Sequence, residues 1–196
     1  MILRLTGRET SLVLRNRPQL LKVQSLTGVP WQAIAAVWYR ENNLQLISAR
    51  LGGPFQFDPP AQALEITNLL SSYTKLTADE IAEYIKAGID DFETGALVAA
   101  CYLRHKSKAV LTPTCSDEDI KDAFWGYNGR AYGAADHSPY VMNGWDKDHM
   151  GSDGKGMVLI GSLPDEKDPS KRIEVHTVDR RPGAFTVYTQ LKAFVA

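Results

Sequence analysis

Apolar residues recur every three to four positions through most of the first 130 residues, and glycines and prolines interrupt the pattern at short intervals. A period of about 3.6 residues predicts amphipathic helices rather than strands. Two helix starts are marked further, since Thr77 and Glu80 have capping-box spacing and Ser116 precedes a run of acidic residues. We expect helices in residues 17–26, 29–43, 61–73, 77–88, 90–108 and 117–130, and again in 182–195.

The chain changes character at about residue 130. Residues 131–156 are rich in glycine, aspartate and aromatic residues without a clear period, which indicates a long ordered loop. Residues 156–163 and 172–178 are strand candidates separated by turn-forming residues, a pattern typical of a hairpin. Because there is no repeat, low-complexity tract or linker, we expect one domain over residues 1–196. Its class is mainly α (α+β), with an irregular, partly β C-terminal part.

Residues 51–60 differ from the helices around them, because they include two glycines, three prolines and two phenylalanines. This density of proline and glycine excludes a helix, and the alternation at 55–57 favours a short extended piece. Gly52 and Gly53 leave room for a close approach to the backbone. Gln56 offers an amide between two aromatic faces, a mixture that suits a sugar. An ordinary tight turn packed by its aromatic residues explains the same stretch.

A carboxylate interrupts the apolar stripe of the second predicted helix. Ile34, Val37 and Trp38 recur at helical spacing, and the next position on that face is Glu41. Desolvation and the negative end of the helix dipole both raise the pKa of a carboxyl group, and Arg40 points elsewhere around the helix. A carboxyl kept protonated near neutral pH can protonate a glycosidic oxygen. The alternative is that Glu41 simply ends the stripe and reaches water.

A tyrosine with the same inward orientation lies near the end of the helix predicted at 117–130. Ile120, Phe124 and Tyr127 share one helical face, so the Tyr127 hydroxyl enters the interior and needs a hydrogen-bond partner. A buried carboxyl group would provide that partner. A core tyrosine with one ordinary hydrogen bond fits the pattern as well.

Composition excludes several classes of function. The chain has 22 basic and 23 acidic residues, so it lacks the positive charge of a dedicated nucleic-acid binder. No run approaches the roughly 20 apolar residues of a membrane span. The N-terminal residues mix charged and apolar side chains too evenly for a secretory signal peptide. We therefore expect synthesis in the cytoplasm, with no signal peptide and no membrane span.

Potential metal ligands and thiols match no known site pattern. Residues 146–154 contain three aspartates, but their spacing misses the calcium-loop pattern, and the four histidines are scattered. We therefore expect no metal and no cofactor. Two cysteines are too few for a disulfide framework. Cys101 falls in an apolar helical run typical of a buried thiol, while a single bridge to Cys115 stays open as an alternative.

Three stretches follow one another: a helix ending in Glu41, "GPFQFD" at residues 53–58 and "GYNG" at residues 126–129. Together they resemble goose-type lysozymes and soluble lytic transglycosylases, which have a helix ending in Glu-Ser, a G-L-M-Q hairpin and an A-Y-N-A-G segment. The opening "GVPWQAIAAVWYRENN" and the later "SPYVMN" also resemble segments of phage and bacterial lysozyme-like proteins. Asn42 replaces the serine of that pattern, and Pro-Phe replaces Leu-Met. The resemblance covers roughly residues 17–146.

The resemblance implies a lysozyme-like helical domain with a small β-hairpin forming one wall of the cleft. It implies that Glu41 is the general acid for cleavage of the MurNAc–GlcNAc β-1,4 bond of peptidoglycan. Tyr127 would hydrogen-bond the Glu41 carboxyl, and Gln56 would line the cleft. The other residues expected to contact the substrate are Gly53, Phe55 and Asn128.

The expected product depends on Asp58. Attack by water gives hydrolysis, whereas attack by the sugar's own 6-hydroxyl gives a 1,6-anhydro end. Goose-type lysozymes have an Asp directly after their G-L-M-Q-V segment, and Asp58 stands at the matching position. Many transglycosylases have Met-Pro there, and this chain has Asp58-Pro59. We count Asp58 as catalytic and favour hydrolysis slightly, because a second carboxylate assists water. Capping of the helix that starts at Pro59 or Pro60 is the alternative.

These observations predict a monomeric, bacteriolytic glycosidase of the endolysin type. It would act on cell-wall peptidoglycan after release from the cell, or as part of a phage particle. One alternative is a non-catalytic structural or glycan-binding protein with the same fold, against which stands the presence of Glu41, Gln56 and Tyr127. A chitin-cleaving enzyme is the other, since related helical folds accept similar β-1,4 glycans.

Overall fold

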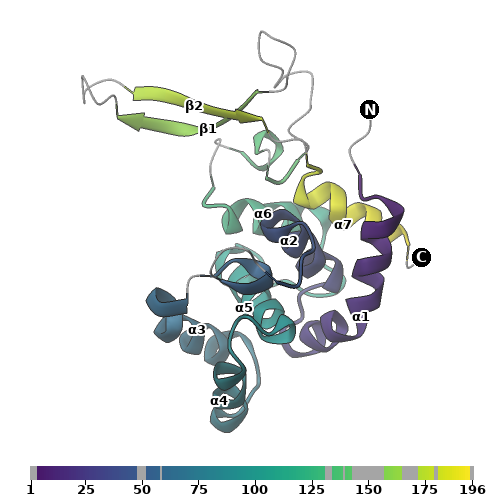
Figure 1. Ribbon diagram of the computed structural model, residues 1–196, viewed down its shortest axis with the longest axis vertical. Coiled ribbons are helices and arrows are strands. Elements are labelled where there is room, and N and C mark those ends of the chain that lie inside the picture. Colours follow the sequence, from purple (N-terminus) through teal and green to yellow (C-terminus); the bar gives the residue numbers. More distant parts are fainter. Residues whose placement is uncertain are drawn as a thin grey trace.

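The computed structural model describes residues 4–47, 52–57, 59–130, 134–138, 140–142, 157–164, 172–178 and 181–194. This part of the chain is mainly helical (Figure 1). Its helices are α1 (Gly7–Thr27), α2 (Trp31–Asn42), α3 (Pro59–Tyr73), α4 (Ala78–Ala87), α5 (Phe92–Lys106), α6 (Asp117–Tyr127) and α7 (Ala184–Ala193). Short 3-10 turns form η1 (Gly53–Phe55) and η2 (Ala135–His137), and two strands form β1 (Met157–Pro164) and β2 (Arg172–Val178).

Helices α2 and α5 form the centre of the fold. Nearly every residue of α2 is buried, and residues 94–101 of α5 are buried without interruption. A helix that is apolar on all sides must be covered on all sides. Accordingly, α2 packs against α1, α5 and α7, and α5 also packs against α1, α3 and α6. Figure 1 shows α1 and α7 on one side of this centre, with α3 and α4 on the opposite side.

Six of the expected helices are confirmed with small shifts at their ends, but the first is much longer than expected. Helix α1 begins at Gly7 rather than residue 17, because Thr6 and Glu9 form a capping box. The Thr6 N–H donates to the Glu9 carboxylate at 2.7 Å, and the Glu9 N–H donates to the Thr6 hydroxyl at 3.3 Å. The helix continues through Pro18, which lies within it, so the predicted helix over residues 17–26 is only its second half.

The extended piece expected at 55–57 is wrong. Residues 53–55 form the 3-10 turn η1, and Gln56 adopts a left-handed backbone with φ 55°. The N–H groups of Gln56 and Phe57 donate to the carbonyls of Gly53 at 3.2 Å and Gly52 at 2.8 Å. These hydrogen bonds form the tight turn that is the alternative interpretation of the segment.

Strands β1 and β2 pair antiparallel, from Met157 opposite Val178 to Pro164 opposite Arg172, with an irregularity between Leu159 and Gly161. Figure 1 shows this pair extending beyond the helices, on the side away from α3 and α4. The pocket described below takes none of its lining from these two strands, as far as the described residues go. The expectation that a β-hairpin forms one wall of the cleft is therefore not supported.

Candidate active site around Glu41

Glu41 lies in the last turn of α2 and faces a pocket of about 280 Å³. The walls of the pocket come from α2, η1, α3, α5 and the end of α6. Its apolar lining consists of Phe55, Phe57, Ile66, Leu69 and Val98. Its polar lining consists of Glu41, Gln56, Glu65, Tyr102, Tyr127 and Asn128. The apolar stripe of α2 thus ends at a pocket, with the carboxyl group at its border.

The Glu41 carboxyl is desolvated and has one hydrogen-bond donor among the described residues. The Tyr140 hydroxyl donates to Glu41 Oε1 at 2.8 Å. Burial raises the pKa of the Glu41 carboxyl above its ordinary value of 4.5, while the hydrogen bond from Tyr140 and the charges of Arg40 and Arg181 oppose the shift. The expected direction of the shift is therefore confirmed. Arg40, expected to point elsewhere, does act on this carboxyl through its charge.

Tyr140 is held in place by two helices, α7 and α2. Its carbonyl accepts the Ala184 N–H at 2.8 Å, and the neighbouring Val141 carbonyl accepts the Phe185 N–H at 2.9 Å. These N–H groups are in the first turn of α7, where no partner exists within the helix itself. The guanidinium of Arg40 lies over the Tyr140 ring, 5.1 Å from its centroid. The tyrosine that binds the acid is therefore fixed by the start of α7 and by the end of α2.

The segment that leads into α7 also fixes the two cations near Glu41. Arg40 is only 5% exposed and donates from Nη1 to the Pro182 carbonyl at 3.2 Å. In return, Arg181 donates from Nη1 to the Arg40 carbonyl at 2.7 Å. Gly183 allows this close packing, because a Cβ there would lie 2.3 Å from the Val141 carbonyl oxygen. Three segments that are distant in sequence thus assemble the surroundings of one carboxyl.

Tyr127 lies at the same pocket, but the expected hydrogen bond from Tyr127 to Glu41 is wrong. In the described part of the chain that bond comes from Tyr140. Tyr127 instead stacks on the Tyr140 ring, with centroids 6.2 Å apart and planes at 17°, and meets the Tyr102 ring edge-on at 5.2 Å. Burial and the nearby Glu41 charge raise the pKa of Tyr127 well above its ordinary value. Tyr127 therefore supports the tyrosine that binds the acid.

The residues around η1 divide into two roles. Gln56 is half-buried and lines the pocket, and Phe55 lines it with little exposed surface while packing against Phe92 at 5.8 Å. Gly53 is buried and does not line the pocket, and a Cβ there would lie 2.2 Å from the Ile89 carbonyl oxygen. The substrate contact expected of Gly53 is therefore not supported. This chain's own backbone occupies the space beside the glycine.

Two further expected residues have different outcomes. Asn128 follows α6 and lines the pocket, and its N–H donates to the Phe124 carbonyl at 3.1 Å. The last helical hydrogen bond of α6 therefore fixes the Asn128 backbone beside the pocket. Asp58 lies outside the described residues, and its expected role stays a prediction.

Sequence analysis missed Tyr140 and Glu65. Tyr140 belongs to the "SPYVMN" segment, which was noted for its resemblance but was given no role. Glu65 is an exposed residue of α3 that lines the pocket together with Ile66 and Leu69 of the same helix. The sequence gives a weak indication of this position, because Glu65 precedes the apolar Leu69 by one helical turn. Both side chains therefore lie on the same face of the helix.

The described residues show no other obvious chemical centre. They contain no group of three or more His, Cys, Asp or Glu side chains placed to hold a metal ion. Cys101 and Cys115 are both free, so they do not form the bridge left open by the sequence. Burial raises the pKa of the Cys101 thiol to about 12, which makes it unreactive. Among the described helices, none is long and apolar enough to cross a membrane.

Comparison with models of known families, with curated proteins and with solved structures found no match to this chain. The chemistry of the site therefore rests on its own geometry. That geometry offers a carboxyl with a raised pKa, a hydroxyl that fixes it and a pocket of mixed apolar and polar lining.

Proposed function

We propose that this protein has a lysozyme-like fold and cleaves the glycan strand of peptidoglycan at the MurNAc–GlcNAc β-1,4 bond. Glu41 acts as the general acid. The observation that carries the proposal is the state of its carboxyl, whose pKa is raised by burial at the border of a pocket. A carboxyl of this kind holds its proton at a pH where an ordinary glutamate has lost it.

The surroundings of Glu41 also suit the carboxylate that the reaction leaves behind. As the glycosidic bond breaks, the proton moves from Glu41 to the departing oxygen, and negative charge develops on the carboxylate. The Tyr140 hydroxyl and the charges of Arg40 and Arg181 favour that charged form. Groups already oriented toward a developing charge stabilise the transition state without rearranging.

The pocket lining supports a carbohydrate substrate. Aromatic side chains such as Phe57 and Tyr102 offer apolar surface for the faces of sugar rings, and Gln56 and Asn128 offer amide groups for hydroxyl and acetamido groups. The choice of peptidoglycan rather than chitin rests on the resemblance of the sequence motifs. The protein would reach the wall after release from the cell or as part of a phage particle.

The test compares wild type with Glu41→Gln on purified peptidoglycan, with chitin as a second substrate, by loss of turbidity and by chromatography of the released fragments. Glu83→Gln, an exposed glutamate on α4, is the matched control. We expect clearing of peptidoglycan by wild type and by the control, and almost none by Glu41→Gln. Equal clearing by all three proteins would remove Glu41 from the mechanism. Binding to peptidoglycan without cleavage by wild type would favour the glycan-binding alternative.

A further inference from the structure

A second carboxylate faces the pocket from α3. Glu65 is exposed, lines the same pocket as Glu41 and has no hydrogen bond or ion pair to the part of the chain that the structure describes. Two exposed acids on other helices do have partners: Glu80 completes the cap of α4 with Thr77, and Glu118 pairs with Lys121 at 2.9 Å. Glu83, which is exposed on α4, has no such partner among the described residues either, but it does not line this pocket. The Glu65 carboxyl group therefore faces the pocket, and no described residue binds it.

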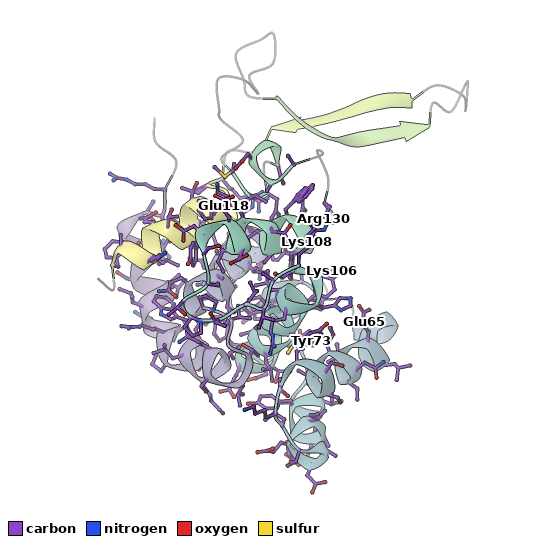
Figure 2. The ribbon with its side chains drawn as sticks, turned by 180° about the vertical axis from the view of Figure 1, so that it is seen from behind. Glu65, Tyr73, Lys106, Lys108, Glu118 and Arg130 are labelled. Atoms are coloured by element: carbon purple, nitrogen blue, oxygen red, sulfur yellow. The ribbon has the colours of Figure 1, made fainter. Side chains whose placement is uncertain are left out.

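The position of Glu65 on its helix directs it toward the site. Leu69, one turn further on, is buried and lines the pocket, and side chains four residues apart lie on the same helical face. In Figure 2, Glu65 lies on the edge of α3 that is turned toward α5, on the same side as Lys106. The pocket is therefore bordered by Glu41 from α2 and by Glu65 from α3, with Gln56 also in its lining.

We propose that Glu65 is the general base of the reaction assigned above, on which this inference rests. Glu41 donates its proton to the glycosidic oxygen as the bond between that oxygen and the anomeric carbon breaks, and the bonding electrons remain on the oxygen. A water molecule attacks the anomeric carbon from the opposite face, and its proton goes to the Glu65 carboxylate. Glu41 ends as a carboxylate and Glu65 as a carboxylic acid, and exchange with solvent restores both.

This assignment has two consequences for the product. Attack by water from the opposite face inverts the anomeric configuration and gives a free reducing end, with no 1,6-anhydro sugar. In inverting glycosidases the acid and base carboxyls are about 6.5–9.5 Å apart, which leaves room for the water. Glu41 and Glu65 border one pocket of about 280 Å³ from two different helices, so a water molecule and a sugar ring have space between the walls. Asp58 is then not needed as the second carboxylate.

The experiment measures kcat and KM on a soluble peptidoglycan fragment for wild type, Glu65→Gln, Glu65→Ala and the Glu83→Gln control. We expect Glu65→Gln to lose kcat by about 10²–10⁴-fold, as for removal of a positioned base. Because Glu65 is exposed, these variants should unfold at the wild-type temperature. Added azide should partly restore turnover by Glu65→Ala, since a small anion can attack without a base. Fresh wild-type product should carry the α configuration by NMR.

Three outcomes would overturn the inference. They are a wild-type product with 1,6-anhydro ends, a product with retained β configuration, and a Glu65→Gln variant with the kcat of wild type. Each of these leaves Glu41 as the acid, provided that Glu41→Gln is inactive in the same assay. A wild-type protein that cleaves nothing would instead refute the proposed function itself, and this inference with it.

Discussion

The two sides of the pocket are built in different ways. On the α2 side, Glu41 is desolvated and bound by Tyr140, which is itself fixed by α7 and by Arg40. On the α3 side, Glu65 is exposed and has no partner among the described residues. The same type of side chain therefore occupies two different environments, and burial raises the pKa of Glu41. Such a difference in environment is how enzymes divide acid and base roles between two carboxyls.

The construction of the two sides differs in sequence distance as well. The surroundings of Glu41 combine segments near residues 40, 140 and 182, whereas η1 and α3 are close neighbours in the chain. The buried side thus depends on tertiary packing, and the exposed side on local turn and helix geometry. Variants on each side should have different effects, and four measurements sharpen or break this comparison.

The largest expected effect is on catalysis. Glu41→Gln keeps the shape of the side chain and its hydrogen bond to Tyr140 but cannot donate a proton, so the rate of wall clearing should fall by about 10²–10⁴-fold. Circular dichroism should show a folded protein with wild-type helix content. A Glu41→Gln variant with wild-type activity would show that Glu41, on the buried side of the pocket, is not the general acid.

The next effect is on the stability of the η1 wall. Gly53→Ala places a Cβ 2.2 Å from the Ile89 carbonyl oxygen in a backbone with φ 63°. The free energy of unfolding should fall by roughly 3 kcal/mol, from a strained left-handed alanine and from overpacking. Gly129→Ala is the matched control, because Gly129 has φ 72° but nothing within 4 Å of its Cβ position. Equal losses in both variants, measured by urea unfolding, would show that the contact with Ile89 has no effect.

A smaller effect separates the two tyrosines. Tyr140→Phe removes the hydrogen bond to Glu41 and should lower the free energy of unfolding by about 1 kcal/mol. It should also move the basic limb of the activity profile to higher pH, because that hydrogen bond lowers the pKa of Glu41. Tyr127→Phe keeps its ring contacts and should change both quantities less. The opposite ranking would restore Tyr127 as the hydrogen-bond donor.

The smallest effect is the pH dependence of stability. The pKa of Glu41 is raised in the folded protein, so above pH 4.5 the unfolded chain releases a proton that the folded state still binds. The free energy of unfolding therefore falls as the pH rises from the ordinary pKa to the raised one. Glu41→Gln lacks this loss, so it should gain stability relative to wild type between pH 4 and pH 8. A constant difference in melting temperature across this range would contradict the raised pKa.

The helices could be predicted because each carries its own signal. The capping box at Thr77 and the apolar periods of α2 to α7 are local features, and the structure has helices at those places. The capping box at Thr6 is equally local. The residues after it mix charged and apolar side chains without a clear period, so periodicity alone places the start of this helix too late. The Phe-Gln-Phe alternation was misleading, because two glycines with positive φ close a turn that a strand pattern does not reveal.

The candidate site was predictable on one side only. Glu41 stood out because a carboxylate on an apolar stripe breaks a local rule, and the desolvation follows from that position. Tyr140 could not be assigned in this way, since its role arises from contacts with α2 and α7, far away in sequence. Glu65 looks like any exposed helical glutamate until its helix is placed beside the pocket.

The contact between α7 and Tyr140 has a consequence for the order in which the molecule matures. A chain is synthesised from its N-terminus, so α2 leaves the ribosome long before residues 181–185, which hold Tyr140 and Arg40 in place. A nascent chain lacking those residues can form the central helices but cannot clamp the donor to Glu41. The hydrogen bond and the charges around Glu41 are therefore completed late, when the last helix docks, and the proposed activity would begin only with the finished chain.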